Sequence, residues 1–162
     1  MKQKLGGTVV CPGSFDPVTL GHLDIFNRAS EQFESVVIAV LQNPAKANLF
    51  SVQERIQLIS EATAKLANVE ITSFQGLLVD FCKSRGISTI VKGLRAVSDF
   101  DYELQMAQLN HQLGDVETLF MATNPTHSFL SSSMAKEVAK FGGNLTELVP
   151  ANVAAALAEK FK

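Results

Sequence analysis

The chain has 162 residues, of which 46% are hydrophobic and 19% charged; this composition supplies enough apolar surface for a folded core and excludes intrinsic disorder. Its 14 Lys and Arg residues against 16 Asp and Glu residues give a formal net charge of −2, which argues against a protein that coats nucleic acid. The length favours one domain over residues 1–162, since domains usually contain about 100 to 200 residues.

The sequence carries no pattern typical of export or of membrane insertion. The longest apolar run, Val36–Leu41, is far shorter than the roughly 20 residues of a membrane-spanning helix, and the first residues lack the apolar core of a signal peptide. Cys11 and Cys82 stand alone, without a CxxC pair or a Cys/His cluster, which argues against disulfides and against a zinc site. We therefore expect a cytoplasmic protein with two buried thiols, no metal ligands and no membrane partner.

Short β-branched runs alternate with longer stretches of helical periodicity along the chain. Four of the five predicted strands lack polar alternation, which is typical of a parallel sheet covered on both faces. Because each βα unit takes about 30 residues, the pattern predicts an α/β fold, a single Rossmann-like doubly wound domain with a five-stranded parallel sheet. In chain order, the strands are expected at Thr8–Cys11, Val36–Leu41, Val69–Ser73, Ile87–Val91 and Val116–Ala122, and the helices at His22–Phe33, Val52–Leu66, Leu77–Arg85, Ser98–Leu113, Ser131–Phe141 and Asn152–Phe161.

Two helix starts are marked by residues that can satisfy free backbone N–H groups. Ser51 and Glu54 form a capping box, in which each side chain accepts a hydrogen bond from the backbone of the other residue. Ser98 is the predicted N-cap of the fourth helix, which carries acidic residues near its positive end. These positions predict where the second and fourth helices begin.

The loops that follow the predicted strands carry most of the reactive side chains. Ligands of a doubly wound sheet bind at the carboxyl ends of its strands, so these loops are expected to share one rim. They bring together a histidine, three basic residues and a cluster of serines, an arrangement that suits a polyphosphate. The loops are Pro12–His22, Gln42–Asn48, Lys92–Arg95 and Asn124–Ser133.

Two common phosphate-binding motifs are absent. The sequence has neither GxGxxG after the first strand nor GxxxxGK[ST], which argues against ordinary dinucleotide dehydrogenases and P-loop NTPases. Thr19-Leu20-Gly21-His22 stands at the first helix instead. Gly21 permits close approach of the backbone to a phosphate, and the helix dipole favours a neutral His22 ring that donates one N–H.

These loops resemble a known group of enzymes. Ser14-Phe15-Asp16-Pro17 followed by Thr19–His22 is similar to the signature of the HxGH/TxGH nucleotidyltransferase superfamily. The segments Lys92–Met106 and His127–Ser133 resemble the bacterial phosphopantetheine adenylyltransferase family, and the likeness extends over nearly the whole chain. It implies transfer of the adenylyl group of ATP to 4′-phosphopantetheine, giving dephospho-coenzyme A and pyrophosphate by direct in-line attack, a step of coenzyme A biosynthesis.

The same resemblance implies roles for individual residues. It implies that His22, Lys46 and Arg95 are catalytic and that Ser14, Lys46, Leu78 and Lys92 bind phosphopantetheine. It also implies magnesium carried on ATP with few or no protein ligands, and a homohexamer. The implied ATP contacts are Ser14, Phe15, His22, Gly93, Leu94, Arg95, Glu103, His127, Ser128, Phe129, Leu130, Ser131, Ser132 and Ser133.

Two residues depart from a common form of the family pattern, and alternatives from two classes of function compete with it. Lys92 stands where many relatives have Arg, and His127 stands where an aromatic such as Trp is frequent. The nearest enzymatic alternatives act on nicotinamide mononucleotide or transfer a cytidylyl group, and the run Lys92–Met106 argues against both. A non-catalytic nucleotide sensor is the alternative from another class, and the presence of His22 and Arg95 argues against it.

Overall fold

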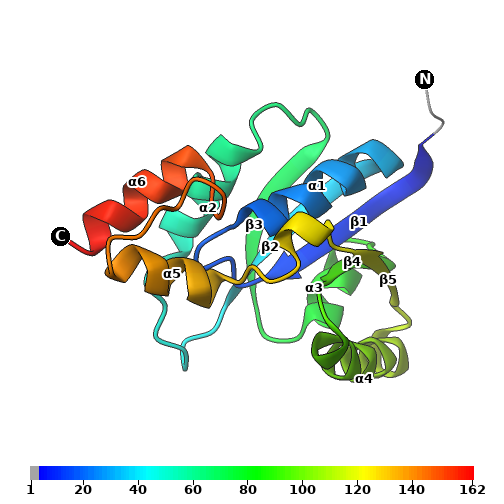
Figure 1. Cartoon of the computed structure of the whole chain (residues 1–162). Coiled ribbons are helices and arrows are strands. Elements are labelled where there is room, and N and C mark those ends of the chain that lie inside the picture. The colour runs from blue at the N-terminus through cyan, green and yellow to red at the C-terminus, as the bar shows by residue number, and fades with distance from the viewer. Residues whose placement is uncertain (1–3) are drawn as a thin grey trace.

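The computed structural model describes residues 4–162, apart from the side chains of Val97 and Ser98. In this part of the chain, strands and helices alternate as the sequence predicts (Figure 1). The strands are β1 (Leu5–Gly13), β2 (Phe33–Gln42), β3 (Val69–Gln75), β4 (Thr89–Leu94) and β5 (Glu117–Ala122). The helices are α1 (Leu20–Gln32), α2 (Val52–Ala62), α3 (Leu78–Ser84), α4 (Val97–Gly114), α5 (Ser132–Lys140) and α6 (Ala151–Lys160), with a short 3₁₀ helix η1 at Pro125–His127.

The five strands form one sheet in the order β3-β2-β1-β4-β5, and every pair of neighbours is parallel. This arrangement confirms the predicted doubly wound parallel sheet. The chain builds outward from β1 to β3, then crosses back to place β4 on the other side of β1. Such a reversal leaves a crevice at the carboxyl ends of the two central strands, where ligands of this architecture bind.

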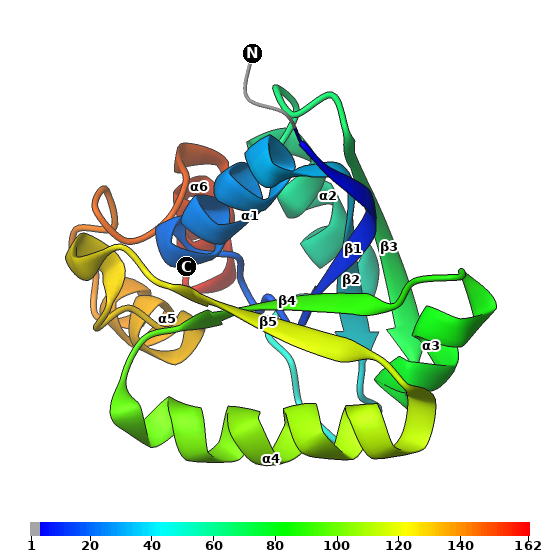
Figure 2. The same ribbon diagram turned by 90° about the vertical axis from the view of Figure 1, so that its right-hand side faces the viewer.

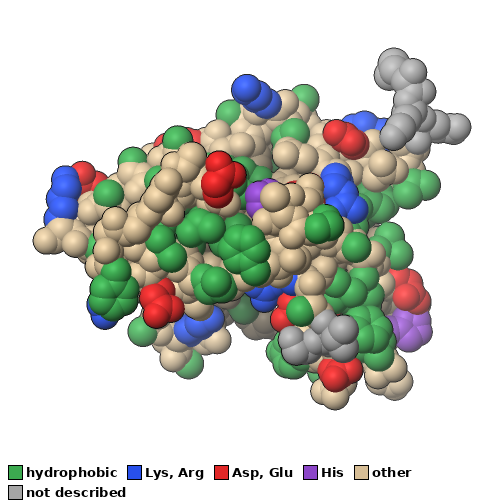
Figure 3. Space-filling model, viewed as in Figure 1, with side chains coloured by type: hydrophobic (Ala, Val, Ile, Leu, Met, Phe, Trp, Pro, Cys, Tyr) green, Lys and Arg blue, Asp and Glu red, His purple; other side chains and the backbone are tan. Residues whose placement is uncertain are grey.

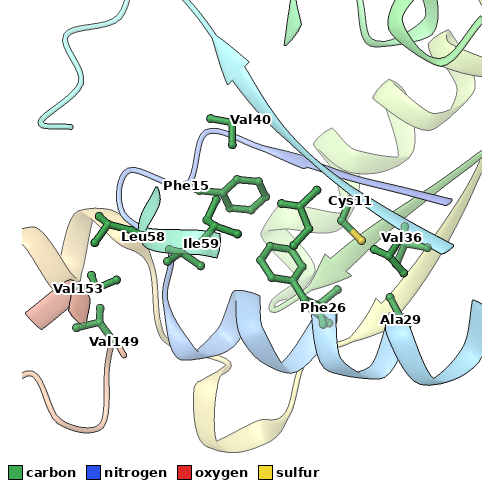
Figure 4. Packing of buried hydrophobic residues seen from close by; sticks show 14 of the residues in the cluster. Cys11, Phe15, Phe26, Ala29, Val36, Val40, Leu58, Ile59, Val149 and Val153 are labelled. Carbon is green, nitrogen blue, oxygen red and sulfur yellow. The ribbon is translucent and has the colours of Figure 1, made fainter. Parts of the chain in front are cut away.

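Helices cover both faces of the sheet, which explains why its strands are continuously apolar. Alternate residues point to opposite faces: Val9 and Cys11 pack with α1, α2, α5 and α6, whereas Val10 packs on the other face with α3. Figure 2 shows α3 and α4 across the sheet from the other helices. Figure 4 shows the first of these cores, in which Phe15, Phe26 and Ile59 point toward one another. The β1–α1 loop that contains Phe15 is thereby anchored in the core.

Acidic and basic side chains are interspersed over the face shown in Figure 3, as expected from the small net charge. Among residues 4–162, no helix combines the length and the hydropathy needed to cross a membrane.

The capping box at the start of α2 is confirmed, but the helix ends earlier than predicted. Ser51 Oγ accepts from the Glu54 backbone N–H at 3.2 Å, and the Ser51 N–H donates to Glu54 Oε2 at 2.7 Å. The last helical residue is Ala62 rather than Leu66. The Thr63 backbone N–H and hydroxyl both donate to the Ile59 carbonyl, at 2.9 and 2.8 Å, and the Thr63 backbone then leaves the helical region, with φ −106° and ψ 11°.

The predicted N-cap of the fourth helix is wrong. The N-cap of α4 is Ala96, whose backbone is extended, so the helix begins at Val97 and Ser98 lies inside its first turn. The side chain of Ser98 lies outside the described residues. Ser98, a residue type that often caps helices, therefore does not fix the start of α4, because the backbone becomes helical one residue earlier, at Val97.

Candidate active site

The two central strands separate toward their carboxyl ends. Over the part of the chain that the structure describes, β1 and β4 pair only at Val9–Thr89 and Val10–Ile90, although both strands continue for several more residues. A cavity of about 490 Å³ lies beyond this separation, bordered by Gly13 of β1 and Gly93 of β4. We call it the large cavity. It lies where the reversal of strand order predicts a ligand site.

Two glycines at the strand ends permit close packing around the large cavity. A Cβ at Gly13 would come within 2.7 Å of the Phe15 ring, and one at Gly93 would come within 2.9 Å of Ile25 Cγ1 on α1. Phe15 itself has a positive φ of 49°, which is uncommon for a residue with a side chain and often marks a functional site. The β1–α1 loop is thus held in one conformation, with its ring buried and its backbone at the cavity.

His22 borders the large cavity as a neutral hydrogen-bond donor. The Thr19 backbone N–H donates to His22 Nδ1 at 3.0 Å, so the proton of the neutral ring lies on Nε2. Burial, followed by the charges of Arg95 and Lys92, lowers the pKa of His22 from 6.5 to about 4. The Phe15 ring meets the imidazole edge to face at 5.1 Å between centroids. The ring is therefore oriented and uncharged.

Arg95 is held in place by residues from two other elements. Its Nη1 donates to the Leu130 carbonyl at 2.6 Å, and its Nε donates to Asp99 Oδ2 on α4 at 3.1 Å. Arg95 borders the large cavity together with Asp99 and Leu130. Its guanidinium is a fixed positive charge that connects the end of β4 to the segment before α5.

Lys92 and Glu103 form an ion pair at 3.3 Å between Nζ and Oε1. Both residues border the large cavity and also a second cavity of about 250 Å³, which we call the apolar cavity. Leu78, predicted to contact pantetheine, lies in the wall of the apolar cavity with Phe74 and Met106. A positive charge thus stands at the junction between a polar cavity and an apolar one.

Only part of the segment His127–Ser133, which is predicted to complete the nucleotide site, borders the large cavity. Leu130, Ser131 and Ser132 border the large cavity. Ser131 Oγ accepts from the Met134 N–H at 3.2 Å and caps α5, while Ser132 Oγ donates to the Pro17 carbonyl at 2.7 Å. These bonds place the start of α5, with its positive dipole end, beside the β1–α1 loop.

The other four residues of that segment lie outside the lining of both cavities. Ser128 donates to the Pro125 carbonyl at 3.0 Å, and the Phe129 and Ser133 side chains are exposed. His127 lies against Gly21, and its Nδ1 is buried with no hydrogen-bond partner among the residues that the structure describes. None of these contacts assigns a nucleotide-binding role to the segment from His127 to Phe129.

Three further predicted residues do not border either cavity. Lys46 is exposed on the β2–α2 loop, where its backbone N–H donates to the Asn43 carbonyl at 3.1 Å. The carbonyl of Ser14 accepts from Arg55, and Leu94 pairs with Ala122 at the end of the sheet. The structure therefore brings together His22, Lys92, Arg95 and Glu103 around the large cavity, whereas Lys46 lines neither cavity.

Sequence reasoning missed Asp16, Arg55 and Tyr102. Asp16 and Arg55 are almost completely buried beside the β1–α1 loop, and Tyr102 borders both cavities. Arg55 precedes Ile59 by four residues, so the helical periodicity of α2 already places it on the buried face. Asp16 belongs to the recognised motif, but its burial depends on partners that are distant in the sequence.

Neither a cluster of metal ligands nor a low-pKa thiol is found among the described residues. Over residues 4–162, no cluster of three or more His, Cys, Asp or Glu side chains could hold a metal ion. Burial raises the pKa of the Cys11 thiol to about 12, partly offset by the charge of Lys92, so the thiol stays protonated.

Comparison with known proteins identifies the family. Residues 10–138 match the family model described as cytidylyltransferase-like. A curated relative, the phosphopantetheine adenylyltransferase of Streptomyces coelicolor, is 62% identical over 153 residues, which cover 94% of this chain and 96% of that protein. The chain belongs to the phosphopantetheine adenylyltransferase family. Its members are nucleotidyltransferases, so the predicted enzyme class is confirmed.

A solved structure of another protein has a fold similar to that of this chain. A Vibrio parahaemolyticus protein of proposed nicotinate-nucleotide adenylyltransferase activity matches 95% of this chain and 93% of its own chain, with a TM-score of 0.69 and 15% sequence identity. At that identity the likeness concerns the fold alone. The phosphopantetheine adenylyltransferase family thus shares its Rossmann-like sheet with a protein of very different sequence.

Proposed function

We propose that this chain transfers the adenylyl group of ATP to 4′-phosphopantetheine, giving dephospho-coenzyme A and pyrophosphate. The observation that carries this proposal is the junction of the large and apolar cavities at Lys92. The large cavity, with a fixed guanidinium and a helix N-terminus, suits a nucleoside triphosphate. The apolar cavity suits an extended acceptor that ends in a phosphate, because Lys92 lies where the phosphate would meet the nucleotide.

The reaction needs no covalent intermediate with the enzyme. A phosphate oxygen of phosphopantetheine attacks the α-phosphorus of ATP, and the bond from that phosphorus to the oxygen bridging to the β-phosphate breaks. Negative charge increases on the α-phosphate oxygens, so a donor already oriented toward them stabilises the transition state. We assign this role to His22 Nε2–H, and we assign the triphosphate to Arg95 and the acceptor phosphate to Lys92 and Lys46.

We propose that magnesium is bound by the phosphates of ATP rather than by protein side chains. The described side chains offer no carboxylate cluster for the ion, and Mg²⁺ commonly binds the phosphates of ATP and keeps several waters. The backbone of Phe15, the backbone of Gly93–Arg95 and the hydroxyls of Ser131 and Ser132 are the remaining contacts proposed for ATP. The homohexamer and the cytoplasmic location implied by the family resemblance stay predictions.

A pyrophosphate-release assay tests the function directly. Purified protein is given ATP and magnesium with 4′-phosphopantetheine, nicotinamide mononucleotide or glycerol phosphate, and release is followed with a coupled enzyme. We expect release with phosphopantetheine alone, and mass spectrometry should identify dephospho-coenzyme A as the product. CTP in place of ATP is the control for the nucleotide. Release with nicotinamide mononucleotide but not with phosphopantetheine would overturn the proposal.

His22 is expected to titrate with a pKa of about 4, because burial and the nearby charges of Arg95 and Lys92 oppose its protonation. Nuclear magnetic resonance of the ring nitrogens should show the Nε2-protonated tautomer at neutral pH. Since the pKa of the unfolded chain is 6.5, the unfolded state takes up a proton first, and folding stability falls as the pH drops from 6.5 toward 4. A midpoint near 6.5 in the folded protein would contradict this assignment.

Replacing Lys46 or Lys92 with alanine is expected to raise KM for phosphopantetheine more than KM for ATP. Each ammonium is proposed to make a charge-assisted contact with the acceptor phosphate, worth roughly 1.5 to 3 kcal/mol, or about 10- to 100-fold. Steady-state kinetics with each substrate varied in turn measure the effect. Lys83→Ala on α3, where the ammonium donates to the Leu113 carbonyl, is the matched control. Equal changes for both substrates would show that the assignment is wrong.

A further inference from the structure

Asp16 is a buried carboxylate that borders neither cavity. It is 4% exposed on the β1–α1 loop, between Phe15 and the start of α1. Its Oδ1 accepts from the Phe50 N–H at 2.9 Å, and its Oδ2 accepts from the Leu49 N–H at 2.9 Å and from Lys136 Nζ at 3.1 Å. A buried charge is costly unless such partners are present, so each of these bonds is needed.

The backbone groups that Asp16 holds belong to the loop carrying Lys46. Leu49 and Phe50 follow Lys46 by three and four residues, at the end of the β2–α2 loop. Figure 1 draws this loop in cyan at the lower side of the molecule, where α4 and α5 also lie. Asp16 therefore fastens the loop to the β1–α1 loop at a point close to Lys46.

Arg55 secures the other end of the same loop. Its Nη1 donates to the Leu41 carbonyl at 3.1 Å, just before the loop begins, and to the Ser14 carbonyl at 2.7 Å. Burial lowers the pKa of the guanidinium, and the charge of Asp16 acts in the opposite direction. Both ends of the β2–α2 loop are thus tied to the β1–α1 loop, while Lys46 is exposed between them.

We infer that Asp16 is a positioning residue, which fixes the β2–α2 loop so that Lys46 can reach the acceptor phosphate. The inference rests on the proposed role of Lys46 in binding that phosphate. Both carboxylate oxygens of Asp16 accept from backbone N–H groups. An asparagine has only one acceptor oxygen and would present its NH₂ group to one of those N–H donors. Asp16→Asn should therefore release one end of the loop without changing the size of the side chain.

A double-mutant cycle with Lys46 tests the inference. Asp16→Asn is expected to lower kcat/KM for phosphopantetheine about tenfold, the loss typical of a charged hydrogen bond, while the dissociation constant for ATP changes less than about twofold. In the Lys46→Ala background, Asp16→Asn should have almost no further effect, because both substitutions remove the same contact. Amide hydrogen exchange at Leu49 and Phe50 should become faster in Asp16→Asn and stay unchanged in Lys46→Ala.

The controls separate this inference from the function on which it rests. Glu54→Gln removes another carboxylate that accepts a backbone N–H beside this loop. It should lower the melting temperature while leaving kcat/KM for phosphopantetheine and the dissociation constant for ATP unchanged. If Asp16→Asn does not fold, Lys136→Met keeps the carboxylate, removes its counter-charge, and should weaken phosphopantetheine use selectively. If the effects of Asp16→Asn and Lys46→Ala on kcat/KM multiply in the double mutant, Asp16 does not act through Lys46. That result would overturn the inference on Asp16 and leave the role of Lys46 intact. Normal kinetics of Lys46→Ala would overturn the role of Lys46 and, with it, this inference.

Discussion

Replacing His22 with alanine is expected to lower kcat by about 100-fold, with little change in the dissociation constant for ATP. The loss of one preorganised donor to a developing oxyanion costs about 3 kcal/mol. The donor is preorganised here because the Thr19 N–H fixes Nδ1 as the acceptor and the Phe15 ring holds the imidazole. Single-turnover kinetics and direct measurement of ATP binding separate the two parameters.

His111→Ala is the matched control for this experiment. His111 lies on α4 with its ring exposed, its Nδ1 is 3.2 Å from Glu117 Oε1, and it lines neither cavity. The substitution should leave kcat unchanged. His22→Ala should also lose part of its stability, about 1 kcal/mol, because the His22 side chain belongs to the capping box of α1. Near-normal turnover of folded His22→Ala would remove His22 from the mechanism.

Arg95→Lys is expected to lower kcat/KM for ATP by about 10- to 100-fold, whereas Lys92→Arg should change it less than about threefold. Arg95 uses two different nitrogens to bind Leu130 and Asp99, which fixes the plane of its guanidinium at the large cavity. A lysine has one nitrogen and cannot reproduce this geometry. Lys92 makes one ion pair with Glu103, which a guanidinium can also make.

The melting temperature of each variant distinguishes a functional role from a structural one. Arg95→Lys loses the bond to the Leu130 carbonyl, so a small decrease is expected along with the kinetic loss. The kinetic loss should persist at temperatures where the variant is fully folded. If the two substitutions change kcat/KM equally, or if the loss disappears below the melting transition, the triphosphate is bound by other residues.

The fold could be predicted because its determinants are local. Continuous apolar runs such as Val36–Leu41 indicate buried parallel strands, and Ser51 with Glu54 marks the start of α2 without reference to the rest of the chain. The loops around His22 and Arg95 could be located because the topology of such a sheet places strand ends on one rim. The end of α2 shows the limit of this reasoning, because the backbone leaves the helical conformation at Thr63 although the apolar periodicity continues to Leu66.

The interactions that complete the site could not be predicted from the sequence. Asp16 is 120 positions from Lys136, and Arg95 is 35 positions from Leu130, so neither contact follows from any local pattern. The ion pair of Lys92 with Glu103 depends on how closely α4 lies to β4. Packing between elements decides these contacts, and periodicity gives only the face on which a residue lies.

The separation of β1 from β4 allows the fold and the acceptor specificity to change independently. Because the described pairing of these strands ends at Val10 and Ile90, the part of the chain that the structure describes has no ladder hydrogen bond across the crevice beyond them. Substitutions at its walls can widen, narrow or recharge it without breaking a strand pair. An engineer seeking a new acceptor can therefore replace lining side chains other than the glycines while β1 stays paired with β2 and β4 with β5.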